Sequence, residues 1–414
     1  MTQSAEKKGD FVVGYYAGNR ATGALAVVSR KSGKTETQVL PTTPESGFEA
    51  EYKPIFVGLT RDQRAVLLDP ASKKINVQAN FPADAFPAHI YEDPGSTRRW
   101  FMNDGDKQTG NDRLNCGDAG SSVTIIDAVD SADASYLKTV CVGRGHHQAA
   151  YTFPTTRAPE VPRRAYISNL KDGTLSVIGN DPAQPADFLR LLDTIDLCEA
   201  DKEEGGKSGV PNNSFPHGLV YSPHTGRLYN LNNGYGNIAV IDPRTNKIES
   251  RLGFKGNSNL FMVPGGRYII GRGADRKSDP AHVVATLTVL DLESMQIVDR
   301  MALPDIYVSK YYFNPTGTRL YLTTGSSGSP EQQANLKADA LLVIDLTTLP
   351  KLVLRRELRL GSPSGSLAFA GGVVLSSNGE NGALVVIDAE SDEIVERIAA
   401  VGQPLPHSRV WTLG

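Results

Sequence analysis

Apolar residues gather in short runs along the whole chain, and small polar turns separate the runs. Many runs are rich in β-branched residues and end in Asp, as at 123–127 and 238–242. Short apolar runs bounded by turn residues are typical of β-strands rather than helices. The same phrase occurs at residues 24–28, 65–69, 123–127, 175–178, 238–242, 287–291, 341–345 and 384–388.

The copies follow one another at intervals of roughly 40–55 residues, a period typical of propeller blades. Residues 215–253 show the unit most clearly, with strands expected at 218–221, 227–231, 238–242 and 248–252. Pro and Gly supply the turns between them, and four short consecutive strands make one blade. The same order of strands and turns fits 257–303, 308–361 and 364–402 and, with insertions, 85–142 and 145–196.

The two ends of the chain complement each other. Residues 11–16 behave as the second strand of a blade that lacks its innermost strand, whereas 408–413 form an innermost strand with nothing after it. Pairing them closes the ring and removes the open edges. The sequence therefore predicts an all-β fold, a single propeller of eight four-stranded blades over 10–414, after a flexible segment at 1–9. Residues 47–83 are the weakest copy, and without them the count is seven.

Composition and charge narrow the function classes. A net charge of −3 and a pI near 6.2 give no basic surface for nucleic acid. No apolar run approaches the length of about 20 residues that a membrane-spanning helix needs. The polar residues 1–10 lack the apolar core of a signal peptide, so the chain is either cytoplasmic or the mature form of an exported protein. We expect a periplasmic or secreted protein.

Cysteine content leaves two interpretations open. Cys116 and Cys141 bracket one strand-turn-strand unit and could pair, which would leave Cys198 as a single thiol. Three reduced thiols in a cytoplasmic protein are the alternative.

Four of the seven histidines occupy one position of the repeat. His217 precedes the second-strand residues 227–229 by the same interval that separates His89 from 99–101, and His147 and His407 each precede an innermost strand. Because a propeller brings equivalent positions to one axis, we expect all four imidazoles on the face where the axial channel opens. In other blades the position is held by Ser258, Ser309 and Gly365, with Glu49 or Glu51 near it in the weak copy.

This placement predicts a metal site formed by His89, His147, His217 and His407. Neutral imidazole binds copper, iron, nickel and zinc, and the side without imidazole would leave room for a substrate. A shared structural hydrogen bond inherited by duplicated blades is the alternative for these histidines. Candidates for contacts around the metal or substrate are Glu49, Glu51, Arg144, His146, Ser258, Ser309 and Lys310.

The segment 217–242, which reads His-Gly-Leu-Val-Tyr-Ser-Pro, then Gly-Arg-Leu-Tyr, then Gly-Asn-Ile-Ala-Val-Ile-Asp, resembles the YVTN-type propeller repeats. That superfamily also contains lactonase-like and cytochrome-d1-like propellers. The resemblance implies the fold over nearly the whole chain, and function must come from the site. The histidine set is also similar in kind to the iron site of carotenoid-cleaving oxygenases and to histidine-rich copper propellers, which favours copper or iron as the cofactor.

Three functions compete on these observations. The first is a metal-binding propeller, with copper or iron as a redox centre of an oxidoreductase whose substrate and redox partner are unknown. The second is a non-catalytic propeller whose face holds a protein, a peptide or a haem-like ligand. The third, lactonase-like hydrolysis, needs carboxylate ligands in the channel, and Asp and Glu are scarce at the innermost-strand positions.

Overall fold

The computed structural model describes most of the chain from residue 148 onward and a discontinuous set of segments before it. The described residues are 9–18, 23–39, 56–59, 64–69, 74–80, 87–104, 116, 121–127, 135–145, 148–378, 382–401 and 407–413. Residues 1–8 lie outside this set, so the flexible N-terminal segment stays a prediction.

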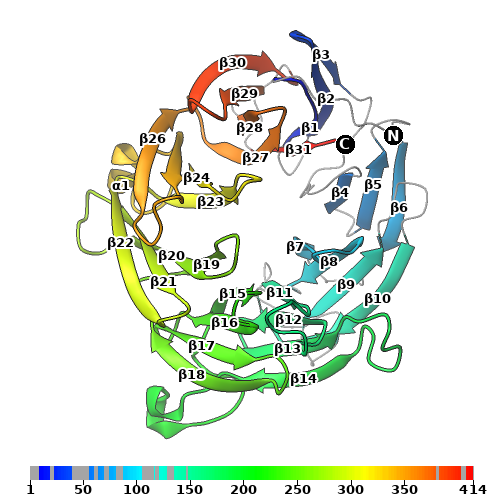
Figure 1. Ribbon diagram of the computed structural model, residues 1–414, viewed down its shortest axis with the longest axis vertical. Helices are drawn as coiled ribbons and strands as arrows, with labels where there is room; N and C mark the ends of the chain where they lie inside the picture. Colours follow the sequence, from blue (N-terminus) through cyan, green and yellow to red (C-terminus); the bar gives the residue numbers. More distant parts are fainter. Residues whose placement is uncertain are drawn as a thin grey trace.

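Antiparallel sheets stand side by side around a central axis, each with one edge toward the axis (Figure 1). Seven sheets of the described chain have four strands, and the unit at 47–83 contributes a sheet with three described strands. The propeller prediction is thereby confirmed.

The strands of the first four sheets are β1 (Phe11–Gly18), β2 (Gly23–Lys31), β3 (Lys34–Val39) with β31 (His407–Thr412); β4 (Phe56–Leu59), β5 (Arg64–Asp69), β6 (Lys74–Asn80); β7 (Pro87–Glu92), β8 (Arg98–Asn103), β9 (Ser122–Asp127), β10 (Ser135–Cys141); and β11 (Ala149–Thr152), β12 (Arg164–Asn169), β13 (Thr174–Gly179), β14 (Leu191–Asp196).

The other four sheets are β15 (Pro216–Ser222), β16 (Arg227–Asn232), β17 (Asn237–Asp242), β18 (Lys247–Gly253); β19 (Asn259–Met262), β20 (Tyr268–Asp275), β21 (Val284–Asp291), β22 (Gln296–Pro304); β23 (Val308–Phe313), β24 (Arg319–Thr324), β25 (Ala340–Asp345), β26 (Val353–Arg359); and β27 (Ser364–Ala370), β28 (Val373–Asn378), β29 (Ala383–Asp388), β30 (Glu393–Ala399). Between them lie the short helices η1 (Ala200–Lys202), η2 (Glu204–Gly206) and α1 (Pro330–Asn335). In the described part of the chain, no helix has the length and apolarity to cross a membrane.

The predicted closure of the ring is confirmed. β31 pairs antiparallel with β1, from Gly18 opposite His407 to Val13 opposite Thr412, and the sheet order is β3-β2-β1-β31. The last strand of the chain is therefore the innermost strand of the first blade. This pairing gives β1 a partner on both sides, so neither of its edges is left open for association with another chain.

Apolar side chains fill the layers between adjacent sheets. Val123, Trp100 and Tyr151 share one layer, to which β7–β10 and β11–β14 both contribute. Val13, Leu375 and Val410 share another, which joins the last blade to the first. Third strands such as β13 and β17 bury every residue, on both faces, whereas the outer strands β14 and β26 are largely exposed. This explains why the third strand of a blade reads as a continuous apolar run.

The Asp that ends many of these runs has a local structural role. The Oδ1 atom of Asp242 accepts a hydrogen bond from the main-chain N–H of Arg244, at 3.0 Å. Asp345 and Asp388 accept equivalent bonds from the residues two positions on, at 2.8 and 2.9 Å. Asp at the end of the third strand therefore closes the turn into the outer strand, which accounts for its recurrence in the sequence.

Candidate functional site

The predicted position of the histidines is the start of the innermost strands. His89 is the third residue of β7, His217 the second of β15 and His407 the first of β31. The side chain of His407 lies outside the described set, as do His146, His147, Glu49 and Glu51 as whole residues. The described parts therefore agree with the alignment of the repeats, and the metal-ligand role stays a proposal.

A β-bulge lies at this position in several blades. The pairing of the innermost strand with its neighbour shifts between Pro87 and His89, between Pro216 and Leu219, between Val308 and Lys310, and between Ser364 and Leu367. A bulge inserts an unpaired residue and re-aims its side chain. His217, Ser309 and Gly365 lie inside these shifts, so the histidine position coincides with the irregular end of the strand.

His217 is held by the next blade. Its Nδ1 atom lies 2.8 Å from the carbonyl oxygen of Ser258. A carbonyl oxygen only accepts hydrogen bonds, so Nδ1 carries the proton and the ring lone pair is on Nε2. Ser258 thus contributes its main chain, and it bonds to the second strand of its own blade through its N–H and hydroxyl, which both donate to the carbonyl of Arg272.

The histidines are distributed unevenly around the ring. His89 and His217 belong to β7 and β15, and His147, which is not among the described residues, falls between them in the repeat. Figure 1 shows β7, β11 and β15 on one side of the axis, with β31 across the ring. The blades of β11 and β15 contact each other directly at this end. The main-chain N–H of Leu219 in β15 donates to Oε1 of Gln148, the residue before β11, at 3.1 Å. Among the residues described, no three His, Cys, Asp or Glu side chains form a metal-binding group.

Elsewhere around the ring, basic side chains bind main-chain carbonyls at the starts of innermost strands. Arg272 Nη1 donates to the carbonyl oxygens of Val308 and Ser309, at 2.6 and 3.0 Å. Burial lowers the pKa of the Arg272 guanidinium. Arg409 Nη1 donates to the carbonyl oxygen of Gly365, at 3.2 Å. Basic side chains therefore hold the starts of β23 and β27, much as His217 holds the chain before β19.

The two cations suggested from the sequence differ in their surroundings. Arg144 forms an ion pair with Asp172, with Nε 2.7 Å from Oδ1, and its main-chain N–H donates to the same carboxylate. Its charge is therefore already compensated. Lys310 is half-buried in β23, and its N–H donates to the Thr323 hydroxyl.

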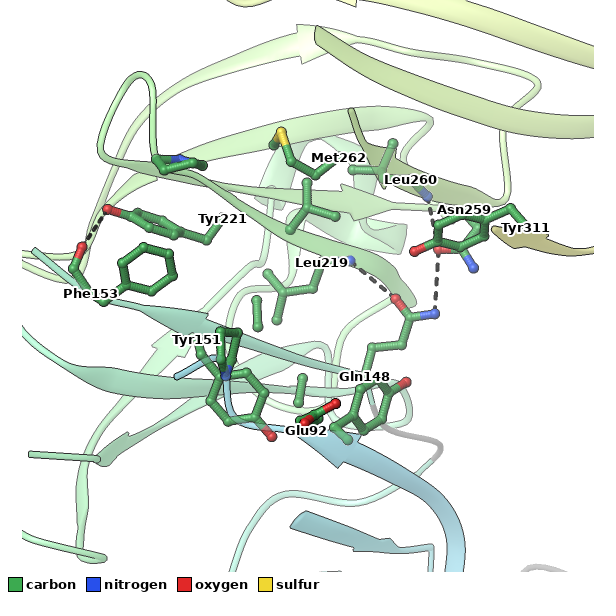
Figure 2. Close-up of a pocket in the computed structure, with 16 residues that line it drawn as sticks. Glu92, Gln148, Tyr151, Phe153, Leu219, Tyr221, Asn259, Leu260, Met262 and Tyr311 are labelled. Carbon is green, nitrogen blue, oxygen red and sulfur yellow. Dashed lines mark hydrogen bonds between the residues drawn. The ribbon is translucent and has the colours of Figure 1, made fainter. Parts of the chain in front are cut away.

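A pocket of about 490 Å³ lies between the innermost strands (Figure 2). Its walls come from β7, β11, β15, β19 and β23, and they include the aromatic side chains of Tyr91, Tyr151, Phe153, Tyr221 and Tyr311. Leu219, Leu260 and Met262 add aliphatic surface. Pockets of this size and composition are typical of small-molecule sites.

Gln148 and Asn259 form the polar end of this pocket. Gln148 Nε2 donates to Asn259 Oδ1 at 3.4 Å, so the two amides connect β11 with β19 (Figure 2). Each amide immediately follows a residue of the predicted site, His147 and Ser258 respectively. Sequence analysis did not identify this pair, although the repeat alignment contained the signal: an amide one residue after the histidine position in two blades.

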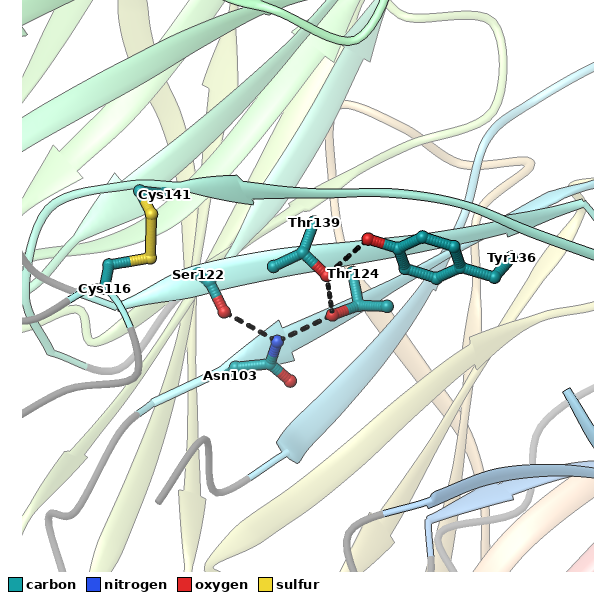
Figure 3. The surroundings of a disulfide bond; sticks show 7 residues. All are labelled: Asn103, Cys116, Ser122, Thr124, Tyr136, Thr139 and Cys141. Carbon is teal, nitrogen blue, oxygen red and sulfur yellow. Dashed lines mark hydrogen bonds between the residues drawn. A yellow bond between two sulfur atoms is a disulfide. The ribbon is translucent and has the colours of Figure 1, made fainter. Parts of the chain in front are cut away.

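Cys116 and Cys141 are joined by a disulfide, with Cα atoms 5.8 Å apart (Figure 3). Beside it, Asn103 Nδ2 donates to the hydroxyls of Ser122 and Thr124. Of the two interpretations left open by the sequence, the structure supports pairing, and Cys198 is the free cysteine. The bond ties the insertion between β8 and β9 to the outer strand β10.

The sheets, the closure and the axial pocket define this chain as a β-propeller. No protein-family model and no curated protein matches its sequence. Solved structures with the same fold include dihydro-haem d1 dehydrogenase NirN in complex with DHE, with a TM-score of 0.60 and 14% identity over 97% of this chain and 75% of that one. AztD of Citrobacter koseri has a TM-score of 0.57 and 12% identity over 97% and 98% of the two chains.

The periplasmic gluconolactonase PpgL of Pseudomonas aeruginosa has a TM-score of 0.57 and 11% identity over 97% of this chain and 100% of that one. These similarities confirm the β-propeller fold expected from the repeat. At such low identity they show the fold alone, because one fold carries many functions.

Proposed function

We propose that this propeller binds a metal ion through imidazole groups at the starts of its innermost strands. The observation that carries the proposal is the bond from His217 Nδ1 to the carbonyl oxygen of Ser258, at 2.8 Å. Metal-binding histidines typically donate one ring N–H to a carbonyl or carboxylate, which fixes the tautomer and orients the other nitrogen toward the metal. His217 makes such a bond at the start of β15, which supports the proposal.

His89 and His147 are the natural companions of His217, since they occupy the same position in the two preceding blades. Glu49 or Glu51 would orient an imidazole from the outside, and the blades that carry Ser, not His, at this position, at Ser258 and Ser309, would supply contacts to a substrate. Copper and iron are the first candidates because imidazole suits both. With either ion bound, the protein would have a redox centre, as an oxidoreductase requires.

The test is metal loading of protein purified without an affinity tag or chelator. Copper, iron, nickel and zinc are added separately, unbound ion is removed, and the remaining metal is measured by elemental analysis. We expect near-stoichiometric binding of at least one ion. His217→Ala should weaken it by at least about 10–100-fold, the loss that follows even from removing an outer partner of a metal ligand.

His282→Ala is the matched control, because His282 is an exposed histidine that pairs with Asp305 away from the innermost strands. Equal metal content in wild type, His217→Ala and His89→Ala would contradict the proposal. So would equal losses in His217→Ala and His282→Ala, which would indicate binding to surface histidines.

The alternative of a haem-like ligand receives less support from the pocket. Carboxylates such as those of haem are well matched by Arg, and no Arg, Lys or His is found among the described residues that line the pocket of Figure 2. NirN was solved in complex with DHE, but the shared fold does not carry that ligand to this chain. We therefore favour the metal ion.

We also propose that the protein works outside the cytoplasm. The disulfide between Cys116 and Cys141 supports this location, because such bonds persist in oxidising compartments and are rare in the cytosol. Secretion of the full-length gene product, followed by thiol labelling of each cell fraction, tests the proposal. Finding all of the protein in the cytosol with three reactive thiols would contradict it.

A further inference from the structure

The pocket between the innermost strands is almost free of charge. Among the described residues that line it, only Glu92 has a side chain that is ionised near neutral pH, and it forms an ion pair with Arg99, at 3.3 Å. Burial raises the pKa of the Tyr221 hydroxyl to about 12 and that of the Tyr151 hydroxyl well above its ordinary value. Both therefore stay neutral near neutral pH. The nearby guanidinium groups of Arg99 and Arg272 are engaged with Glu92 and with the carbonyl oxygens of Val308 and Ser309.

Aromatic rings form much of the wall and are held in fixed positions. Tyr221 donates its hydroxyl proton to the carbonyl oxygen of Phe153, at 2.9 Å, and the two rings meet edge to face at 5.2 Å. Tyr311 stacks on Phe261 with ring centroids 3.7 Å apart, yet 36% of Tyr311 remains exposed. Pre-positioned aromatic surfaces of this kind favour flat apolar rings.

The polar end of the pocket presents donors rather than acceptors. Gln148 Oε1 already accepts from the Leu219 N–H, and Asn259 Oδ1 accepts from the Leu260 N–H at 2.8 Å and from Gln148 Nε2 (Figure 2). The amide hydrogens of Asn259 Nδ2 have no acceptor among the residues the structure describes, and Gln148 Nε2 has one hydrogen beyond the bond to Asn259. A ligand that fills this end must therefore supply an acceptor oxygen.

We propose that this pocket binds an uncharged small molecule with a flat apolar ring and a carbonyl-type acceptor at one edge. The ring lies between the aromatic walls, and the acceptor receives hydrogen bonds from the amides of Gln148 and Asn259. The site is distinct from the proposed metal site, since no histidine is among its described lining residues.

The experiment uses 6-propionyl-2-(dimethylamino)naphthalene, an uncharged naphthalene ketone whose emission shifts to the blue in apolar surroundings. We expect saturable binding with one site per protein. Anilinonaphthalene sulfonate, a flat probe with a negative charge, should bind at least about tenfold more weakly, because the described lining residues include no cation to compensate a desolvated negative charge.

Asn259→Asp and Gln148→Glu test the donors without emptying the pocket. Each keeps the side-chain oxygen that accepts the main-chain N–H and replaces the amide donor by a carboxylate oxygen. Each substitution should lower the affinity for the ketone probe about tenfold or more, as loss of a buried hydrogen bond predicts. Gln184→Glu makes the same chemical change at an exposed site away from this pocket and should bind like wild type.

Circular dichroism and the urea midpoint verify that each variant is folded, and Tyr311→Ala provides a second route if an acidic variant is not. Because the Tyr311 side chain is partly exposed, its removal should lower the affinity for the probe without unfolding the protein. The proposal is overturned if the ketone probe does not saturate, if both acidic variants and Tyr311→Ala bind it like wild type, or if the sulfonate binds equally well. Metal loading is measured on the same samples, so failure of the metal site and failure of this pocket are told apart.

Discussion

Gly14 lies directly opposite Trp411 in the sheet that closes the ring, and a Cβ atom at residue 14 would overlap the indole of Trp411. The first and last blade segments can therefore approach closely only because residue 14 has no side chain. Trp411 is almost fully buried there, so the closure depends on this pair as well as on main-chain hydrogen bonds.

Gly14→Ala is expected to destabilise the protein by about 1–3 kcal/mol, the usual cost of overpacking a well-packed layer. The free energy of unfolding in urea measures it. Gly253→Ala is the control, because residue 253 lies in a strand, outside the left-handed region, with open space where a Cβ would be. Equal effects of the two substitutions would contradict the role given to the Gly14–Trp411 contact.

The position of β31 across the ring from β15 leads to a prediction about His407. His407→Ala should retain most of the bound metal, whereas His217→Ala and His147→Ala should lose it, because β15 and β11, the innermost strands of the corresponding blades, lie in neighbouring sheets on one side of the axis. Elemental analysis after loading checks this difference. Loss of metal from His407→Ala as complete as from His217→Ala would show instead that the site spans the ring.

The disulfide sets the number of reactive thiols. Denatured protein without reductant should show one thiol, from Cys198, and reduced protein should show three. Replacing Cys116 and Cys141 by Ser should lower the free energy of unfolding by about 3 kcal/mol. The bond closes a loop with a sequence separation of 25 residues and so reduces the conformational entropy of the unfolded chain. Cys198→Ser should leave the stability unchanged. Three thiols before reduction would show that the bond is absent.

Asp392 is fully buried between two arginines. Its Oδ1 lies 2.8 Å from Arg319 Nη1 and its Oδ2 lies 2.5 Å from Arg355 Nε. Asp392→Ala should lower the free energy of unfolding by about 3–5 kcal/mol, since it leaves the partly buried Arg319 without its counter-charge. Glu393→Ala removes an exposed ion pair with Arg356 and should cost about 0–1 kcal/mol. Urea unfolding of both variants makes the comparison.

Asp275 gives a prediction about acid stability. Hydrogen bonds from the Ser278 side chain and from the N–H groups of Lys277 and Ser278 lower the pKa of Asp275 to about 2. Because the pKa in the folded protein lies below that in the unfolded chain, the contribution of Asp275 is present above about pH 4 and is lost as the pH falls toward 2. Asp275→Asn should therefore be less stable than wild type at pH 6, and the difference should shrink at pH 2.5. A constant difference across urea midpoints at these pH values would contradict the assignment.

The repeat made much of the fold predictable. Each blade repeats one order of strands and turns, and features such as the Asp that closes the turn after the third strand act within a few residues. Even the ring closure was predictable, because residues 11–16 lacked an innermost strand and 408–413 supplied one. The starts of the innermost strands at His89, His217 and His407 followed from the same alignment.

The contacts around these positions were not predictable in the same way. Three of these contacts join different blades. They are the bond from His217 to Ser258, the amide pair of Gln148 and Asn259, and the pocket whose polar end this pair forms. Local sequence fixes where a residue stands within its blade, because strand periodicity and turn chemistry act over a few residues. Only the tertiary structure decides which neighbouring side chain it meets, because that depends on how adjacent blades pack and on the bulges that re-aim the ends of their innermost strands.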